Sequence, residues 1–296
     1  MTMTTPTNNG LIRKTTVFLE MIKFPHTVFA LPFALTGALL AAGGLPDARQ
    51  LFWIILAMVG ARTAAMGLNR LIDADIDARN PRTAGRAIPA GLIGKEVTLS
   101  FILASLALLL VAAAKLNPLC LMLSPLALFF LVLYSYCKRF TALAHVVLGA
   151  CLAAAPIGAW IAIRGTIDPP ALILGGIVLF WVAGFDILYA LQDLEFDRTA
   201  GLHSIPVALG VNGSLWAARL FHLTMLALLA VLYMIMGLGS FFVAGIVVVA
   251  AMLAYEHWLL RSGDLTRLDA AFFNMNGYIS VAILIFTALE VLVRWV

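Results

Sequence analysis

Residues 61–77 of the chain read ARTAAMGLNRLIDADID, an apolar run that ends in two aspartates four residues apart. Residues 185–197, FDILYALQDLEFD, repeat this arrangement more than a hundred residues later. A spacing of four returns a side chain to nearly the same face of an α-helix, because the helix turns about 100° per residue. Both stretches therefore predict apolar helices with an acidic face at one end.

The composition of the whole chain is that of a membrane protein. Of its 296 residues, 63% are hydrophobic and 11% are charged, whereas soluble proteins are about 45–50% apolar and about 25% charged. Apolar runs near the ~20 residues that cross a bilayer recur along the whole sequence. They leave no stretch large enough for a soluble domain. We expect a single transmembrane domain over residues 1–296, which begins with a polar tail at 1–14, and no nucleic-acid partner.

The runs predict an all-α fold with nine membrane-spanning helices. Long continuous apolar runs favour helices over a β-barrel, whose strands would be short and alternating. The predicted spans are residues 24–43, 51–72, 97–115, 119–137, 142–163, 171–191, 214–236, 239–260 and 271–293.

Basic residues concentrate on one side of the membrane, the side that holds the N-terminus and the loops after the second, fourth, sixth and eighth predicted spans. The positive-inside rule assigns this side to the cytoplasm. The basic residues on it are Arg13, Lys14, Lys23, Arg70, Arg79, Arg82, Arg86, Lys95, Lys138, Arg139, Arg198, Arg261 and Arg267, against Arg49, Lys115, Arg164 and Arg294 on the other side.

The two long loops on this side, at about residues 73–96 and 192–212, resemble each other. Each follows an acidic pair and continues through a glycine to an Ile-Pro step. The copies are about four predicted helices apart, so both run in the same direction across the membrane. A degenerate parallel repeat would place both acidic ends at one end of the bundle, under a cap made by these loops.

On the predicted helix 51–72, Asn69, Asp73 and Asp77 fall within a stripe about 80° wide, with Arg62 on the same stripe two turns deeper. Asp75 projects away from the stripe.

The predicted helix 171–191 carries the second stripe. Asp186, Asp193 and Asp197 lie within about 40° of one another, and Tyr189 is close to them. Glu195 projects away from this stripe.

Carboxylates at these positions need a compensating charge, because a charged residue at mid-membrane costs ~2.5–3.5 kcal/mol. Magnesium takes one or two carboxylates and completes its octahedron with water and phosphate oxygens. Two acidic pairs therefore predict a diphosphate held between two Mg²⁺ ions. The basic residues Arg82, Arg86, Lys138 and Arg139 would neutralise the remaining phosphate charge.

Each of these features also has an ordinary structural explanation. An acidic helix end can be a solvated cap. Arg62 and Asp186 would form a buried ion pair between their helices as readily as they would contact a substrate. His203, in the second cap loop, could contact the diphosphate or could simply be a solvated loop histidine.

The stretches ARTAAMGLNRLIDADID, YSYCKR and DILYALQDLEFD, followed by GLHSIPVALG, resemble the motifs of the UbiA superfamily of intramembrane prenyltransferases. Asn69, Asp73 and Asp77 match its first motif, Asp193 and Asp197 match its second, and Tyr134, Lys138 and Arg139 match a motif of its fourth helix.

The resemblance implies a nine-helix bundle in the cell (inner) membrane, with a cavity that is open to lipid. In that cavity a Mg²⁺-bound polyprenyl diphosphate would ionise beside an aromatic acceptor. Stabilising the departing diphosphate more in the transition state than in the ground state would accelerate the reaction. An apolar chamber would keep water from the allylic cation.

Within the superfamily, MIKFPHTVFALPFALTG at residues 21–37 resembles the 4-hydroxybenzoate polyprenyltransferase subgroup of quinone biosynthesis. Gln192-Asp193 and the segment GLHSIP also resemble members of the futalosine branch of menaquinone synthesis. The acceptor implied is therefore 4-hydroxybenzoate, for ubiquinone, or a dihydroxynaphthoate-type acid, for menaquinone.

Arg62, Lys23 and Arg139 are candidates to bind the acceptor carboxylate. Asp186 is a candidate base that removes the ring proton after attack, with solvent and a diphosphate oxygen as equal alternatives. Each cation also has an ordinary explanation: Arg62 could form a buried ion pair, Lys23 could snorkel to the membrane surface, and Arg139 could simply orient the protein in the membrane.

Two other functions remain open from the sequence. One is prenyl transfer to a haem, chlorophyll or ether-lipid acceptor on the same scaffold. The other is cation-coupled transport, since acidic residues in a repeat-built bundle can bind a cation. Both acidic pairs lie at one end of the predicted bundle and not at its middle, which favours the enzyme.

Overall fold

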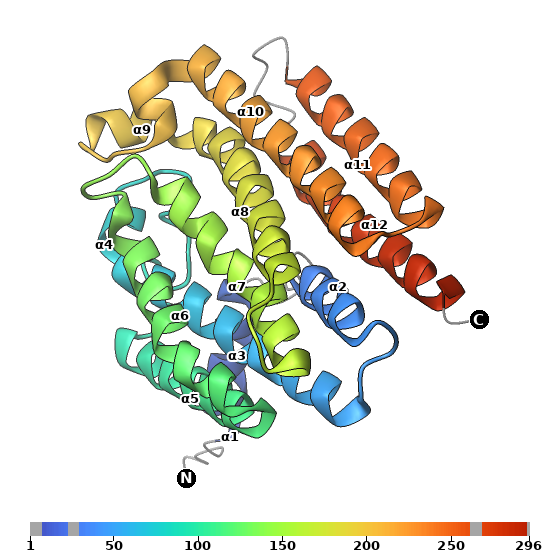
Figure 1. Ribbon diagram of the computed structural model, residues 1–296. Helices are drawn as coiled ribbons and strands as arrows, with labels where there is room; N and C mark the ends of the chain where they lie inside the picture. The colour runs from blue at the N-terminus through green and yellow to red at the C-terminus, as the bar shows by residue number, and fades with distance from the viewer. Residues whose placement is uncertain (1–7, 23–29, 261–267, 295–296) are drawn as a thin grey trace.

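The structure is a computed structural model that describes residues 8–22, 30–260 and 268–294. Its described part contains helices and no strand. The helices are α1 (Asn8–Met21), α2 (Leu31–Ala42), α3 (Ala48–Ile72), α4 (Ala74–Asp77), α5 (Lys95–Leu116), α6 (Pro118–Cys137), α7 (Ala144–Arg164), α8 (Pro169–Ala190), α9 (Leu194–Thr199), α10 (Ile205–Met236), α11 (Ser240–Leu259) and α12 (Leu268–Arg294), as drawn in Figure 1.

Eight helical segments in the described residues are long and apolar enough to cross a membrane. They correspond to the second to ninth predicted spans. The first, 24–43, is represented by the 12-residue helix α2, because residues 23–29 lie outside the described part. A ninth span therefore stays a prediction. Residues of the expected polar tail from Asn8 onward belong to α1.

The second cap loop is more helical than the sequence suggested. Within 192–212, residues Leu194–Thr199 form α9, and α10 begins at Ile205. Helix α10 starts there because the Ser204 side chain accepts a hydrogen bond from the Val207 N–H, at 3.2 Å, and Pro206 occupies the first turn. Gly210, with φ +66°, bends the chain where α10 continues into the bundle.

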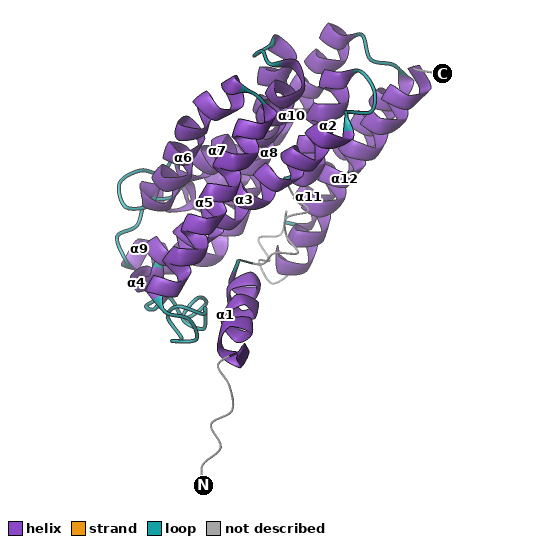
Figure 2. Ribbon diagram, turned by 90° about the horizontal axis from the view of Figure 1, so that it is seen from below, coloured by secondary structure: helices purple, strands orange, loops and turns teal. Residues whose placement is uncertain are grey.

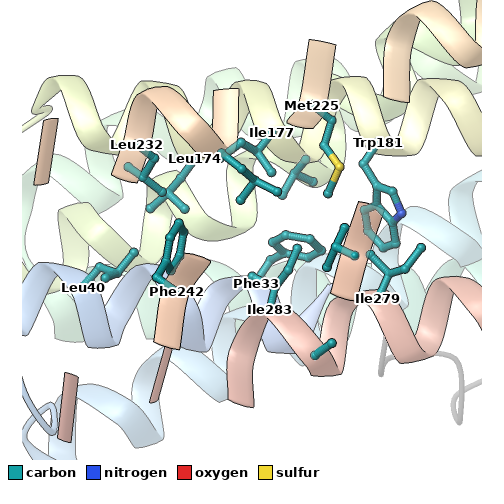
Figure 3. Close-up of a cluster of buried hydrophobic side chains, with 14 of the residues drawn as sticks. Phe33, Leu40, Leu174, Ile177, Trp181, Met225, Leu232, Phe242, Ile279 and Ile283 are labelled. Atoms are coloured by element: carbon teal, nitrogen blue, oxygen red, sulfur yellow. The ribbon is translucent and has the colours of Figure 1, made fainter. Parts of the chain in front are cut away.

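One half of the bundle is densely packed. Phe33 of α2, Trp181 of α8, Met225 of α10 and Phe242 of α11 are buried together with Ile279 of α12 (Figure 3). This core joins the C-terminal helices to the middle of the chain. The other half, formed mainly by α3, α6 and α7, leaves a large internal space.

The two acidic segments lie at the same end of the bundle. Helices α4 and α9 lie at the same end of the bundle in both views (Figures 1 and 2), and side chains of the loop after α4 contact the α8–α9 junction. This placement agrees with the sequence prediction. It results from α3 and α8 each running the length of the bundle and ending at the same level.

Candidate active site

A cavity of about 1110 Å³ begins between the acidic segments and continues into the bundle. Its lining changes from charged to apolar along its length, ending near Leu116, Cys120 and Ile161 at the far ends of their helices. The sequence-predicted site residues that line it are Arg62, Asn69, Asp73, Asp77, Arg82, Arg86, Tyr134, Lys138, Asp186, Tyr189, Asp193 and Asp197.

Asp193 is bound by two residues of the first cap loop. Arg82 donates from Nε to Asp193 Oδ1 at 2.8 Å and from Nη2 to Oδ2, while Asn80 Nδ2 donates to Oδ1 at 3.0 Å. Arg82 also donates to the Tyr189 hydroxyl at 3.1 Å. Burial lowers the pKa of Arg82, but its bonds to Asp193 outweigh burial and leave that pKa raised. The two halves of the acidic end are thus joined by a permanently charged guanidinium.

The first acidic segment is paired in a similar way. Arg86 Nη1 lies 2.6 and 2.7 Å from the two carboxylate oxygens of Asp77. Asn69 Nδ2 donates to Asp73 Oδ2 at 2.8 Å, and Arg139 Nη2 lies 3.1 Å from Asp73 Oδ1. Burial raises the pKa of Asp73 above its ordinary value, although Arg139 opposes this effect. A bound cation would favour the ionised form further.

Asp197 has a buried carboxylate oxygen that fits a bound cation. The residue is 2% exposed, and its Oδ2 has no hydrogen-bond partner. Within the described residues, no three His, Cys, Asp or Glu side chains are gathered closely enough to hold a metal by themselves. The two aspartates of each acidic segment, which line the cavity, fit Mg²⁺, because this ion uses one or two carboxylates and takes its other ligands from water and phosphate. Asp73, Asp77, Asp193 and Asp197, with Asn69 beside them, are the residues that would hold it.

Deeper in the cavity, Arg62 and Asp186 do not form the ion pair that was one of the two alternatives left open by the sequence. Asp186 is instead hydrogen-bonded to His145 of α7, with Asp186 Oδ2 2.7 Å from His145 Nδ1. Arg62 lines the cavity with a buried Nε that has no hydrogen-bond partner. His145 also lines the cavity and was missed in the sequence, because only packing of α7 on α8 brings it to Asp186.

Three other predicted residues are not in the cavity wall as described. His203 is exposed, and its backbone N–H donates to the Lys138 carbonyl. Arg139 lies outside the cavity lining and donates to the backbone carbonyls of Ser135 and Ile72. Lys23 lies outside the described residues.

The two acidic residues expected to point away from the stripes are exposed. The Asp75 side chain is 88% exposed and the Glu195 side chain 82%. Their nearest charged partners, Lys95 at 3.2 Å and Arg198 at 3.3 Å, are surface residues as well.

Fold and site together define a multi-pass membrane protein with an acid-rimmed, largely apolar internal cavity. The chain belongs to the UbiA prenyltransferase family, whose family model matches residues 30–278. It is therefore a prenyltransferase.

Comparison with individual proteins agrees with this family. The chain is 32% identical over 249 residues to a 4-hydroxybenzoate octaprenyltransferase of Vibrio cholerae, covering 83% of this chain and 86% of that protein. It is 29% identical over 260 residues to the one of Francisella tularensis, covering 88% and 89%.

Among solved structures, a UbiA homolog from Aeropyrum pernix K1 superposes with a TM-score of 0.82 at 32% identity, over 92% of this chain and 98% of that chain. A UbiA homolog from Archaeoglobus fulgidus, solved with DMAPP and Mg²⁺ bound, has a TM-score of 0.74 at 20% identity and covers 93% of this chain and 99% of that one. This second likeness concerns the fold.

Proposed function

We propose that this enzyme transfers a polyprenyl group from polyprenyl diphosphate to an aromatic acid, 4-hydroxybenzoate or a dihydroxynaphthoate-type acid, in ubiquinone or menaquinone biosynthesis. The observation that carries the proposal is one continuous cavity with a carboxylate and arginine end and an apolar interior. A diphosphate with a long apolar tail has the same two-part chemistry. The names of the curated relatives and the DMAPP and Mg²⁺ in a structural neighbour support the choice.

In this proposal the acidic end binds the diphosphate. Two Mg²⁺ ions held by Asp73, Asp77, Asp193 and Asp197 would supply positive charge for the leaving group. Arg82 and Arg86, now bound to Asp193 and Asp77, can then donate to phosphate oxygens. Such bonds are charge-assisted and strengthen as negative charge develops on the diphosphate. Lys138 lines the same end.

The apolar interior would hold the prenyl chain and exclude water from the allylic carbon. The acceptor carboxylate would bind Arg62, whose Nε is buried without a partner in the cavity wall. Arg62 is eleven residues before Asp73, which places it ~16 Å deeper along α3. That separation leaves room for an aromatic ring between the diphosphate and the guanidinium. The acidic end would face the cytoplasm, as the distribution of basic residues indicates.

The test is product formation by the purified protein in lipid nanodiscs, given Mg²⁺, a radiolabelled polyprenyl diphosphate and a panel of hydroxylated aromatic acids. Asp73→Ala and Asp193→Ala should each reduce turnover by at least ~10²-fold, because transition-state charge loses its stabilisation. The matched controls are Asp75→Ala and Glu195→Ala, which remove exposed carboxylates of the same segments and should stay within about threefold of the wild type.

Near-normal turnover in either Asp73→Ala or Asp193→Ala would contradict the proposed metal site. Failure of the wild-type protein to prenylate any acid in the panel would contradict the proposed acceptor class.

A further inference from the structure

The bond between His145 and Asp186 lies inside the cavity but outside the diphosphate site. Asp186 is seven residues before Asp193 on the same helical run, so it lies ~10 Å deeper. It is closer to the diphosphate end than Arg62, which lies eleven residues before Asp73. An aromatic ring held between the diphosphate and Arg62 would therefore lie at the depth of Asp186.

The environment of His145 fixes its tautomer. Its side chain is 1% exposed, and its Nε2 lies 3.4 Å from the backbone nitrogen of Ile205 at the start of α10. Because a backbone N–H can only donate, Nε2 must be the acceptor and unprotonated. The proton of the neutral ring is therefore on Nδ1, which donates to Asp186 Oδ2 at 2.7 Å.

Asp186 differs from the carboxylates of the acidic end because its partner is a histidine, His145. Asp73, Asp77 and Asp193 each have an arginine within ion-pair distance. Among the described residues, the group within ion-pair distance of Asp186 is His145, and in this tautomer His145 is a neutral hydrogen-bond donor. The Asp186 side chain is 19% exposed and lines the cavity. The hydrogen bond from His145 uses Asp186 Oδ2, which leaves Asp186 Oδ1 for a ligand.

We propose that Asp186 binds the hydroxyl group of the aromatic acceptor and takes its proton during transfer, and that His145 is a positioning residue that holds Asp186 for this step. The proposal rests on the proposed function. A para-hydroxy acid with its carboxylate at Arg62 has its hydroxyl at the opposite end of the ring, on the side of Asp186 and the diphosphate.

The step balances without any further reactant. Asp186 Oδ1 takes the phenolic proton, and an oxygen electron pair moves into the ring. The ring carbon next to the hydroxyl forms a bond to C1 of the prenyl group, while the C1–O bond breaks and its electron pair leaves with the diphosphate. The resulting dienone loses its ring proton to a diphosphate oxygen, and Asp186 returns its proton to the ring oxygen. One proton leaves with the product diphosphate.

The first test replaces Asp186 by asparagine, which can still accept from His145 but cannot take a proton. We expect kcat for prenyl transfer to fall by ~10²-fold, the range of general-base catalysis. The KM for the prenyl diphosphate and its Mg²⁺-dependent binding should not change. The matched control is Asp168→Asn, which replaces the carboxylate that accepts from Trp160 Nε1 at 2.9 Å outside the cavity wall.

The second test varies the acceptor. A ring-fluorinated 4-hydroxybenzoate has a more acidic phenol and needs less help from a base. The ratio of wild-type to Asp186→Asn turnover should therefore be several-fold smaller with the fluorinated acid than with 4-hydroxybenzoate. A purely structural defect would lower turnover of both acids by the same factor.

The third test concerns His145. His145→Leu removes the donor to Asp186, and turnover should fall by about tenfold. His145→Asn places an amide N–H near the position of Nδ1 and should recover turnover to within about threefold of the wild type. His257→Leu is the control, because it removes a half-buried histidine that is bonded to His222 and lies outside the cavity wall.

The outcomes separate this proposal from the proposed function. Three results would overturn the roles of Asp186 and His145 without touching the proposed function. They are a turnover of Asp186→Asn equal to that of the wild type, a ratio of wild-type to Asp186→Asn turnover that is the same for both acids, and an equal loss of turnover in His145→Asn and His145→Leu. A wild-type protein that binds the diphosphate with Mg²⁺ and prenylates no hydroxylated acid would overturn both proposals. If Asp186→Asn does not fold, the acceptor comparison is made with His145→Leu.

Discussion

Arg82 connects the two acidic segments of the site, and its planar guanidinium is what allows it to do so. It binds both oxygens of Asp193 and also reaches the hydroxyl of Tyr189. A lysine at this position would keep the charge and lose the two-point geometry. Arg82 can exchange its carboxylate for phosphate oxygens when a diphosphate binds, so its effect should be seen in donor binding.

Arg82→Lys should therefore raise the KM for polyprenyl diphosphate about tenfold, with a smaller effect on the KM for the acceptor. The measurement is steady-state kinetics with varied donor at saturating Mg²⁺. Arg198→Lys is the control, because Arg198 is exposed and forms its ion pair with the exposed Glu195, at 3.3 Å. An unchanged donor KM in Arg82→Lys would show that Arg82 serves the cap structure and not the diphosphate.

At the scale of the element, the contact of α7 with α8 positions the deep part of the site. Gly149 allows this contact, since a Cβ at that position would lie 2.4 Å from the backbone oxygen of Leu179. Small residues permit such close approach between membrane helices. The contact also holds His145, near the start of α7, against Asp186 of α8.

Gly149→Ala should force α7 and α8 apart and lower the unfolding free energy by ~1–3 kcal/mol, the usual cost of overpacking. The measurement is thermal unfolding in detergent. Gly158→Ala is the control on the same helix, because a Cβ at Gly158 would have no heavy atom within 4 Å. Equal stability of the two variants would mean that the close approach at Gly149 is not a rigid feature of the fold.

At the scale of the whole molecule, the cavity runs most of the length of the bundle. Along α3 and its C-cap residue, the lining extends from Ile54 to Asp73, a rise of ~28 Å for nineteen residue steps of helix. Gly158 lines its deeper part and leaves open space there. A short prenyl group would occupy only the region next to the acidic end, whereas a long one needs the space beside Gly158.

Gly158→Phe should consequently lower turnover of long-chain donors by about tenfold and leave dimethylallyl diphosphate turnover within about twofold of the wild type. Competition between the two donors in one reaction, with products separated by mass spectrometry, measures this directly. A parallel loss for both donors would indicate general misfolding. An unchanged long-chain rate would place the prenyl tail elsewhere, for example in the surrounding lipid.

The sequence by itself determined the membrane class, the helical fold and most of the charged residues that line the cavity. Apolar runs of bilayer length and aspartates four residues apart are local patterns, and each follows from the geometry of one helix. The two acidic ends could be predicted to meet because Asp73 and Asp193 occur in matching segments whose helices run in the same direction.

Only the tertiary structure decided the partners of these residues. The sequence left open whether Asp186 pairs with Arg62 or contacts a substrate, and the structure pairs it with His145. The sequence also placed His203 with the site candidates, whereas its side chain is exposed in the cap. Which cation reaches which carboxylate, and how deep the cavity extends, depend on how closely α7 packs on α8 and how far α3 lies from α6. Those distances are set by side chains from different helices, so no periodicity along a single helix encodes them.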